Sequence, residues 1–238
     1  MSHKNSYGQP ISFPITDWQE CALPPRFEML GKRCWVKILV PDKHAVELFD
    51  AYINHRNDQD WTYLPYGPFD HFDDYKRWLS GICNGDDPLF NTIIETENNT
   101  AVGMTSFLRI QPRIGVIEVG HIHFSPFIQK TAVATEAMFL MMRRVFDELG
   151  YHRYEWKCDS MNTNSINAAQ RLGFIYEGTF RQATMYKNRN RDTAWLSITD
   201  KEWPNLKKSF QTWLRPNNLD SNGRQKNSLK EIRRYLDQ

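Results

Sequence analysis

A stretch of mostly small side chains stands where a predicted strand meets a predicted helix, and this arrangement suits anion binding. It reads Gln129, Lys130, Thr131, Ala132, Val133 and Ala134. A helix start leaves about four amide N–H groups without intrahelical partners and carries the positive end of the helix dipole. Small side chains let the backbone approach a phosphate closely, and Lys130 adds a positive charge. The pattern predicts a phosphate or pyrophosphate site, and an ordinary turn that binds nothing fits the spacing equally well.

Two histidines on the preceding strand are candidates for metal binding. His121 and His123 are two residues apart, so strand alternation places both on one face. A zinc site needs at least a third ligand, and none is obvious, so core or cleft histidines are the commoner case. The four cysteines are scattered without a CxxC spacing, which favours a reducing compartment over a zinc site or a disulfide framework. We therefore expect no metal.

The elements that position these residues follow from hydrophobic periodicity. Residues 116–125 alternate as a strand, which ends at Pro126 because proline cannot donate to a sheet ladder. Beyond the turn, apolar side chains recur every three to four residues as far as Leu149, and Gly150 ends this amphipathic helix. The same reasoning predicts a helix over 44–54 that Asp42 caps. Further strands are predicted over 33–39, 89–95, 101–110, 153–158, 174–186 and 192–199, and further helices over 70–82, 164–172, 201–214 and 230–236.

Composition limits the classes of function. The chain has 238 residues, of which 40% are hydrophobic, enough for one domain with a core. Thirty basic and 28 acidic residues leave a net charge of +2, so no overall field points to nucleic acid or to a membrane. The first residues lack the apolar segment of a secretory signal, and no run approaches the ~20 apolar residues of a membrane span. We expect a cytoplasmic protein.

Three regions are predicted along the chain. Residues 1–25 hold four of the twelve prolines and form an N-terminal arm, and residues 26–214 form the domain. Residues 215–238 turn polar and are predicted to be a flexible tail. Acidic residues dilute the basic charge of this tail and only Tyr235 offers a stacking platform, so we expect no nucleic-acid partner. The basic residues concerned are Arg224, Lys226, Lys230, Arg233 and Arg234.

Three blocks of sequence carry a resemblance to a known family. Residues 129–136 read QKTAVATE, residues 162–174 read NTNSINAAQRLGF, and residues 177–181 with 191–195 read EGTFR and RDTAW. In this order they resemble the GNAT superfamily of N-acetyltransferases, and most closely the branch of the ribosomal-protein N-terminal acetyltransferases. The first block is similar to the acyl-CoA loop Gln/Arg-x-x-Gly-x-Gly/Ala, with Ala132 where glycine is usual. The resemblance covers roughly residues 26–205.

The resemblance implies an α+β acyl-CoA N-acyltransferase fold that uses acetyl-CoA as co-substrate and no metal. Its mixed sheet of about seven strands, flanked by helices, is expected to splay open between the fourth and fifth strands. The backbone at Ile122, His123 and Phe124 is then expected to pair with the pantetheine arm, and an N–H there to face the thioester oxygen. The amides of residues 129–134 would hold the pyrophosphate. Asn162 and Ser165 would lie near the thiol end.

Acetyl transfer to an amine needs a positioned thioester, a donor to the oxyanion and a base. Glu118 is the predicted base. It stands six residues before Phe124, and this even spacing predicts the same face of the strand. A carboxylate in a largely apolar cleft has a raised pKa, which suits a base. Glu95 and His121 are the alternatives, and a solvated or ion-paired carboxylate is the other interpretation of Glu118.

The leaving thiolate needs a proton. Ser165 matches the serine proposed for this role in the branch that the chain resembles. Many relatives use a tyrosine seven positions after the family asparagine, where this chain has Ala169. Ser165 or a water would take the role, or the thiolate leaves unassisted; a plain helix cap is the other interpretation of Ser165. For Arg181, Arg191 and Asp192, the default interpretation is an ion-pair network in the final hairpin.

Together these inferences predict an N-acetyltransferase that moves an acetyl group from acetyl-CoA to a primary amine by direct transfer in a ternary complex. The acceptor would be a protein or peptide N-terminus or a small amine. The alternative is a catalytically silent acyl-CoA-binding or partner-docking module of the same fold. By resemblance, residues 61–69 wall the acceptor cleft; the alternative is an aromatic plug on the core. We expect no membrane partner, and a monomer or homodimer.

Overall fold

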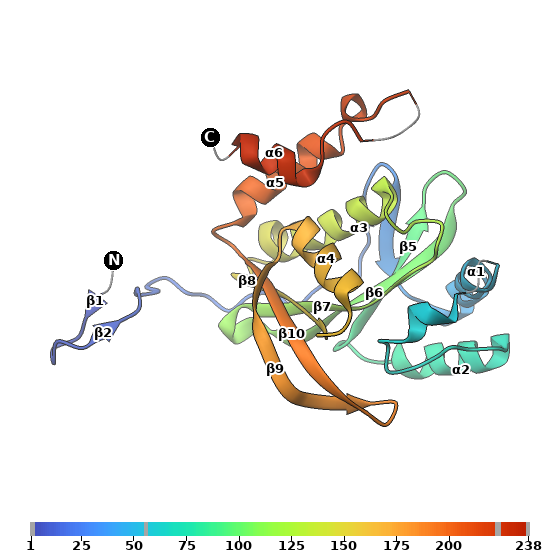
Figure 1. Cartoon of the computed structure of the whole chain (residues 1–238), viewed down its shortest axis with the longest axis horizontal. Helices are drawn as coiled ribbons and strands as arrows, with labels where there is room; N and C mark the ends of the chain where they lie inside the picture. The colour runs from blue at the N-terminus through green and yellow to red at the C-terminus, as the bar shows by residue number, and fades with distance from the viewer. Residues whose placement is uncertain (1–2, 55–56, 222–224, 237–238) are drawn as a thin grey trace.

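An eight-stranded sheet forms the centre of the molecule in the computed structural model, which describes residues 3–54, 57–221 and 225–236 (Figure 1). The strand order is β3-β4-β5-β6-β7-β8-β10-β9, and every neighbouring pair is antiparallel except β7 and β8. The predicted α+β fold with a mixed sheet is confirmed. The sheet has one strand more than the predicted seven because the short β3 pairs at its edge. The strands are β3 Met29–Leu30, β4 Cys34–Ile38, β5 Leu89–Glu95, β6 Thr100–Gln111, β7 Val116–Phe124, β8 Arg153–Asp159, β9 Ile175–Tyr186 and β10 Arg189–Thr199.

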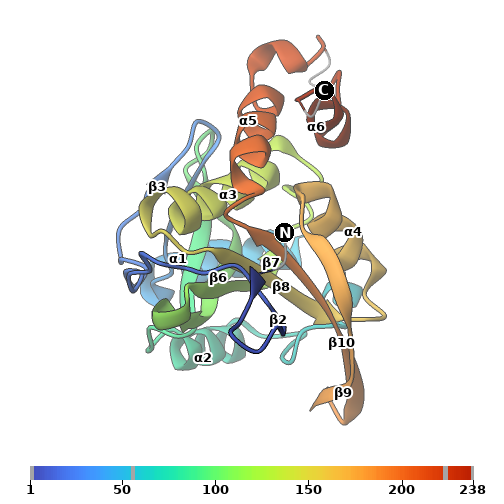
Figure 2. The ribbon, with the colours of Figure 1, turned by 90° about the vertical axis from the view of Figure 1, so that its left-hand side faces the viewer.

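Helices cover both faces of the sheet and divide the core in two (Figures 1 and 2). The first core cluster joins one face of the sheet to buried side chains of α3, α4, α5 and α6. The second joins the other face, over β5 and β6, to α1, α2 and Trp61. The helices are α1 Pro41–Ile53, α2 Phe72–Ile82, α3 Ala132–Arg143, α4 Thr163–Leu172, α5 Trp203–Trp213 and α6 Leu229–Leu236.

The predicted elements are all present, with three corrections at their ends. Helix α1 starts at Pro41, since a proline at the first helical position loses no intrahelical hydrogen bond. Asp42 therefore lies inside the helix, and no side chain caps it. The helix predicted to reach Leu149 changes after Arg143 into a π-helical turn over Arg144–Glu148. The final hairpin turns at residues 187 and 188, both left-handed, rather than over four residues.

Much of the tail belongs to the folded domain. Leu229 and Ile232 of α6 are buried in the first core cluster, against α5. The predicted helix over 230–236 is therefore present as α6, and it packs on the domain instead of extending a flexible tail. Arg224, one of the basic residues considered for nucleic-acid binding, lies outside the described residues.

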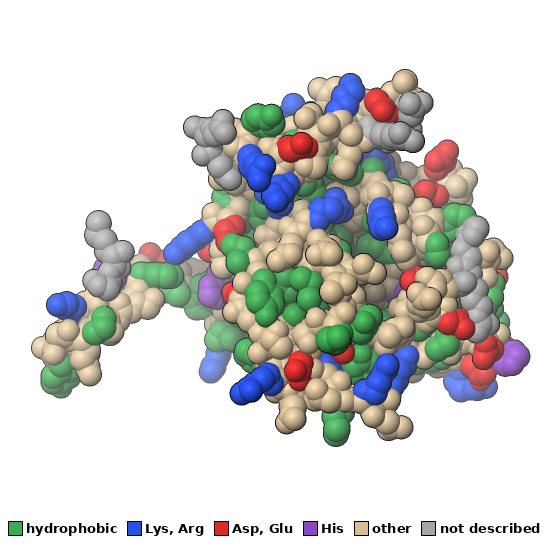
Figure 3. Space-filling model, viewed as in Figure 1, with side chains coloured by type: hydrophobic (Ala, Val, Ile, Leu, Met, Phe, Trp, Pro, Cys, Tyr) green, Lys and Arg blue, Asp and Glu red, His purple; other side chains and the backbone are tan. Residues whose placement is uncertain are grey.

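The N-terminal arm projects from the body and exposes apolar side chains (Figures 1 and 3). It carries a small two-stranded sheet of its own, β1 His3–Lys4 and β2 Pro10–Ile11. Trp18 ties it to the body, because its indole N–H donates to the carbonyl of Arg113 at 2.8 Å and its ring packs on His152. Among the described residues, none of the helices combines the length and hydrophobicity that a membrane crossing requires.

Candidate active site

Strand β7 carries a β-bulge that decides which side chains face the site. His121 and Ile122 together oppose the single residue Thr105 of β6, and His121 has a left-handed φ of 50°. The extra residue inverts the alternation of the strand. Phe124 consequently packs against the first core cluster, whereas Glu118 lies on the opposite face of the sheet. The prediction that these two residues share a face is wrong, because the even spacing spans the bulge.

Glu118 is buried in an ion-pair network rather than in an apolar cleft. It is 3% exposed, and its Oε1 accepts from Arg109 Nη1 at 2.7 Å. Its Oε2 lies 2.8 Å from Lys157 Nζ, which is also 2.8 Å from Glu155 and lies over the ring of Trp195. Burial raises the pKa of Glu118, while the charges of Lys157 and Arg109 oppose the shift. The ion-paired interpretation is therefore correct, and the raised pKa still suits a base.

The two histidines share one face, as predicted; because of the bulge, this is also the face of Glu118, and both histidines are neutral near pH 7. His121 Nδ1 lies 3.0 Å from the hydroxyl of Tyr66, and burial, with smaller contributions from nearby arginines, lowers the pKa of His121 to about 4. His123 stacks on Tyr52 and packs against Trp61, and burial lowers the pKa of His123 to about 3. Within the described chain, no group of three His, Cys, Asp or Glu side chains is placed to hold a metal ion.

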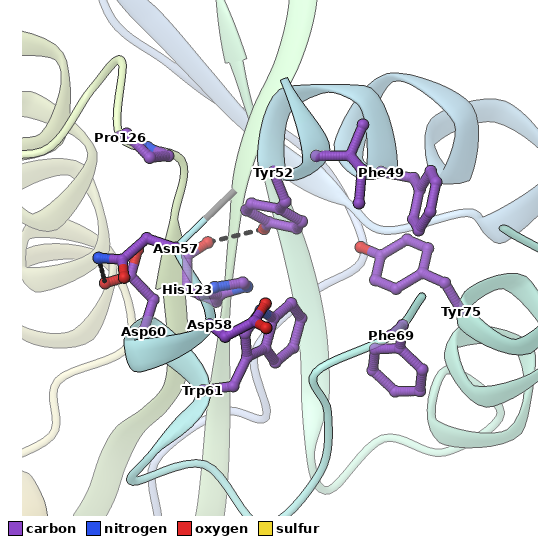
Figure 4. A pocket seen from close by; sticks show the side chains of 11 residues that line it. Phe49, Tyr52, Asn57, Asp58, Asp60, Trp61, Phe69, Tyr75, His123 and Pro126 are labelled. Atoms are coloured by element: carbon purple, nitrogen blue, oxygen red, sulfur yellow. Dashed lines mark hydrogen bonds between the residues drawn. The ribbon is translucent and has the colours of Figure 1, made fainter. Parts of the chain in front are cut away.

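A small pocket lies beside His123, between α1 and the segment that follows it (Figure 4). Tyr52 and Trp61 flank His123, and the hydroxyl of Tyr52 donates to its carbonyl at 2.8 Å. Most of the predicted aromatic loop 61–69 packs into the second core cluster, as the plug interpretation requires. Trp61 and Phe69 also line the pocket. The lining residues are Phe49, Tyr52, Ile53, Asn57, Asp58, Asp60, Trp61, Phe69, Tyr75, His123 and Pro126.

The predicted phosphate loop ends in an open helix start. Thr131 caps α3, and its hydroxyl accepts from the amide of Ala134 at 3.5 Å. The amides of Ala132 and Val133 have no acceptor among the residues that the structure describes. The left-handed residue of the loop is Lys130, with φ 62°, and Ala132 is already helical, so its methyl group causes no backbone strain.

Strands β7 and β8 diverge beyond their first few residues. They pair only from Val116 to Val119 and from Arg153 to Trp156, so residues 120–124 and 157–159 are not paired with each other. We call this opening the splay. Counted from β4, it separates the fourth and fifth strands, as predicted. On its β7 side, the alternation of antiparallel pairing with β6 turns the amide of Phe124 toward the opening.

The start of α4 stands on the β8 side of the splay. Asn162 caps this helix, and its Oδ1 accepts from the amide of Ser165 at 3.0 Å. Ser165 is therefore not the cap, and that interpretation of its role is wrong. Its Oγ accepts from the indole of Trp156 at 3.0 Å, so its own proton is directed toward another acceptor. Cys158 lies beside it: burial raises the pKa of this thiol, and a hydrogen bond with Ser165 opposes the shift.

The tip of the final hairpin reaches the segment after α1. Lys187 Nζ donates to the carbonyl of Trp61 at 2.8 Å, and Arg189 donates to that of Thr62 at 3.1 Å. The hydroxyl of Tyr63 donates to the carbonyl of Met161, just before α4, at 3.1 Å. Residues 61–63 thus connect to both the hairpin and the β8–α4 loop.

The ion-pair network predicted within the hairpin is not formed. Asp192 accepts instead from the amide of Gln182 at 2.7 Å and from the side chain of Asn190 at 2.9 Å. Among described residues, no ion pair joins Arg181 or Arg191 to it. The alternative base Glu95 lies at the far end of β5, where it accepts from Asn98, and contacts none of the site residues.

Comparison with known proteins identifies the family. A family model described as an acetyltransferase (GNAT) domain matches residues 40–175, more than half of the chain. The chain belongs to the GNAT acetyltransferase family. It is therefore a GNAT-family N-acetyltransferase, and this family uses acetyl-CoA.

Solved GNAT structures are similar over most of the chain. A GCN5-related N-acetyltransferase from Brucella melitensis is 43% identical, with a TM-score of 0.90 over 92% of this chain and 99% of that one. A probable acetyltransferase of the GNAT family from Chromobacterium violaceum ATCC 12472 is 36% identical, with a TM-score of 0.76 over 82% of this chain and 98% of that one. The SPbeta prophage-derived uncharacterized N-acetyltransferase YokL of Bacillus subtilis (strain 168) is 26% identical over 54% of this chain and 71% of its own length.

The partners of Glu118 were not among the residues predicted from the sequence. Lys157 had a signal, because charged residues at 153, 155 and 157 alternate with apolar ones along the predicted strand and mark one polar face. Arg109 had none, because its contact with Glu118 depends on the pairing of β6 with β7.

Proposed function

We propose that this GNAT protein transfers the acetyl group of acetyl-CoA directly to a primary amine, at a protein or peptide N-terminus or on a small molecule, within a ternary complex. The observation that carries the proposal is the splay. The open start of α3 follows the end of β7, on one side of the splay. The start of α4, capped by Asn162, follows the end of β8 on the other side. An extended pantetheine arm fits such an opening as an added strand.

The coenzyme would be held largely by backbone groups. The amides of Ala132 and Val133, with the charge of Lys130, would bind the pyrophosphate at the start of α3. Ile122 and Phe124 would offer backbone groups to the pantetheine arm, and an N–H of this segment would polarise the thioester carbonyl; the carbonyl of His123 between them already accepts from Tyr52.

Proton transfer would involve Glu118 and Ser165. The carboxylate of Glu118 would take a proton from the acceptor ammonium, directly or through water, and its raised pKa suits this task. The free amine then forms a bond to the acetyl carbon as the carbon–sulfur bond breaks. The sulfur leaves with the bonding electrons, and the Ser165 hydroxyl would supply a proton to it. Ser165 would regain a proton, through water, from the nitrogen that has formed the new bond.

Calorimetric titration of acetyl-CoA into the wild type and Ala134→Glu tests the coenzyme site. Ala134 is buried at the start of α3, so a glutamate there opposes a pyrophosphate by bulk and by charge. We expect tight binding to the wild type and to the control Ala183→Glu, which adds the same charge to exposed β9, and none to Ala134→Glu. Binding that survives in Ala134→Glu would place the coenzyme elsewhere.

A second experiment separates the enzyme from the silent module of the same fold. Release of free CoA is followed on a panel of amines and peptides, for the wild type and for Glu118→Gln. Turnover that depends on Glu118 supports the enzyme. Coenzyme binding without turnover on any amine, unchanged by the substitution, would support the silent module.

A further inference from the structure

Arg191, near the start of β10, has a buried polar atom without a partner. Its Nε is shielded from solvent and has no hydrogen-bond acceptor within the described residues. No carboxylate among those residues lies within ion-pair distance of its guanidinium. A guanidinium is always charged in proteins, and a buried donor without an acceptor is costly. Such a group is expected to find its acceptor in a ligand.

Three neighbours locate the guanidinium of Arg191. Its carbon lies 5.9 Å from the ring centre of Tyr186 on β9. Its charge adds to the effect of burial in lowering the pKa of His121 on β7. On β8, the same charge opposes the effect of burial, which raises the pKa of the Cys158 thiol. Strand pairing agrees with this position, since Arg191 pairs with Thr184 of β9 and Thr193, two residues on, pairs with Asp159 at the end of β8. Since Cys158 is beside Ser165, this is the thiol end of the splay and not its phosphate end.

The carboxylates on the adjacent segments have other partners. Asp159 accepts from the hydroxyl of Tyr186 at 2.8 Å and from the amide of Met161 at 2.9 Å. Asp192 accepts from the amide of Gln182. Neither is close enough to Arg191 to form an ion pair. The protein thus leaves a positive charge without a counter-ion where an acceptor meets the thioester.

Glu118 does not compensate that charge either, because Arg109 and Lys157 both bind it. The charge of Arg109, like that of Arg191, also acts on His121. An acceptor with several ammonium groups would be repelled by two arginines here, and an acceptor with a carboxylate beside its amine would be attracted.

From this arrangement we infer that Arg191 binds a carboxylate of the acceptor, and that the substrates are amines that carry a carboxylate, such as amino acids or peptides with an acidic residue near the N-terminus. The planar guanidinium presents paired N–H donors that match both carboxylate oxygens. The inference rests on the proposed acetyl transfer and names its acceptor class.

The test compares matched acceptors that differ in one carboxylate. The pairs are alanine with alaninamide, phenylalanine with phenylalaninamide, and Glu-Ala-amide with Gln-Ala-amide. For the wild type, we expect kcat/KM to be at least tenfold higher for the acid in one or more pairs, since a charge-assisted hydrogen bond has that effect. In Arg191→Met, the ratio of kcat/KM for the acid to kcat/KM for the amide should fall toward one. In Arg191→Lys, this ratio should lie between that of Arg191→Met and that of the wild type. The control Arg181→Met, on the same hairpin but exposed, should keep the wild-type ratio.

Binding measurements separate this inference from the proposed function. The same acids and amides are titrated into the protein saturated with CoA, which requires no turnover. Preference for the acids that disappears in Arg191→Met, while its affinity for acetyl-CoA stays unchanged, supports the inference even if none of these amines is acetylated. Equal ratios in wild type and Arg191→Met would overturn it, as would a loss of acetyl-CoA affinity without a change in acceptor preference.

Discussion

The side-chain amide of Gln129 donates a hydrogen bond to the backbone carbonyl of Phe124 at 3.0 Å. The same amide lies 3.3 Å from Asp60 Oδ2. Gln129 opens the phosphate loop, Phe124 ends β7, and Asp60 belongs to the segment after α1. One side chain therefore fixes the loop relative to the strand that we propose pairs with the pantetheine arm.

Gln129→Ala should weaken acetyl-CoA binding about 5- to 30-fold, the effect of about 1 to 2 kcal/mol for lost hydrogen bonds. The loop would lose its connection to β7, so its amides would be less well oriented before binding. Calorimetry measures the change, with Gln170→Ala on the exposed face of α4 as the control. An unchanged affinity would mean that Thr131 and the backbone hold the loop without this side chain.

Glu118→Gln should lower kcat by about 100-fold or more, the usual contribution of a general base. Glu155→Gln is the matched control, because both carboxylates are buried and each lies 2.8 Å from Lys157 Nζ. Both changes disturb the network, but only the first removes the proposed base. Equal losses of kcat in steady-state assays would show that the network has a structural role only.

The pH dependence gives a separate test of Glu118. Burial raises its pKa in the folded protein above the unfolded value, so the folded state holds the proton to higher pH. The contribution of this group to stability is therefore largest at low pH and falls as pH rises through the interval between the unfolded and folded pKa. The rate should fall on the acid side at a pH above the ordinary range of a glutamate. In Glu118→Gln, urea denaturation should no longer show the fall in stability with rising pH, and the rate profile should no longer show the fall on the acid side.

Ser165→Ala should lower kcat about tenfold or more without changing the affinity for acetyl-CoA, because the proposed donor to the leaving sulfur is lost. Trp156→Phe removes the indole that donates to Ser165 and keeps the hydroxyl, so its effect should be smaller. Stopped-flow measurement of CoA release gives both rates. A wild-type rate in Ser165→Ala would indicate that water protonates the thiolate or that it leaves unassisted.

Ile232→Ala should reduce the free energy of unfolding by about 2 to 5 kcal/mol, as for other large-to-small changes in a core. Ile232 is buried in α6 against the first core cluster. Tyr235→Ala, in the same helix but exposed, should change stability little. Chemical denaturation measures both. A small effect of Ile232→Ala would indicate that the tail contributes little to the core.

Local patterns predicted the order of the elements and the turn from β7 into the start of α3. The small residues from Thr131 to Ala134 and the alternation of β7 are contiguous signals, so their meaning does not depend on the rest of the chain. The helix caps were less predictable, although Asp42 and Ser165 are both good capping residues. Helix α1 starts one residue before Asp42, at Pro41, and helix α4 is capped by Asn162 instead of Ser165.

The surroundings of Glu118 were beyond the sequence for a different reason. Its partners Arg109 and Lys157 come from the strands on either side, and their contact depends on register. The bulge at His121 had one local signal, because Gly120 stands immediately before it and a lone glycine within a strand suggests a bulge; the left-handed residue itself, however, is a histidine. Strand faces beyond such a point cannot be counted from spacing alone.

The bulge also affects how relatives of this chain are aligned. Before it, odd-numbered residues such as Ile117 face the first core cluster, and after it the even-numbered Phe124 does so. An alignment gap placed a single position away from residues 121 and 122 would pair core positions with polar ones. Any assignment of a base in another sequence by its distance from the phosphate loop must first establish whether that sequence has the same extra residue.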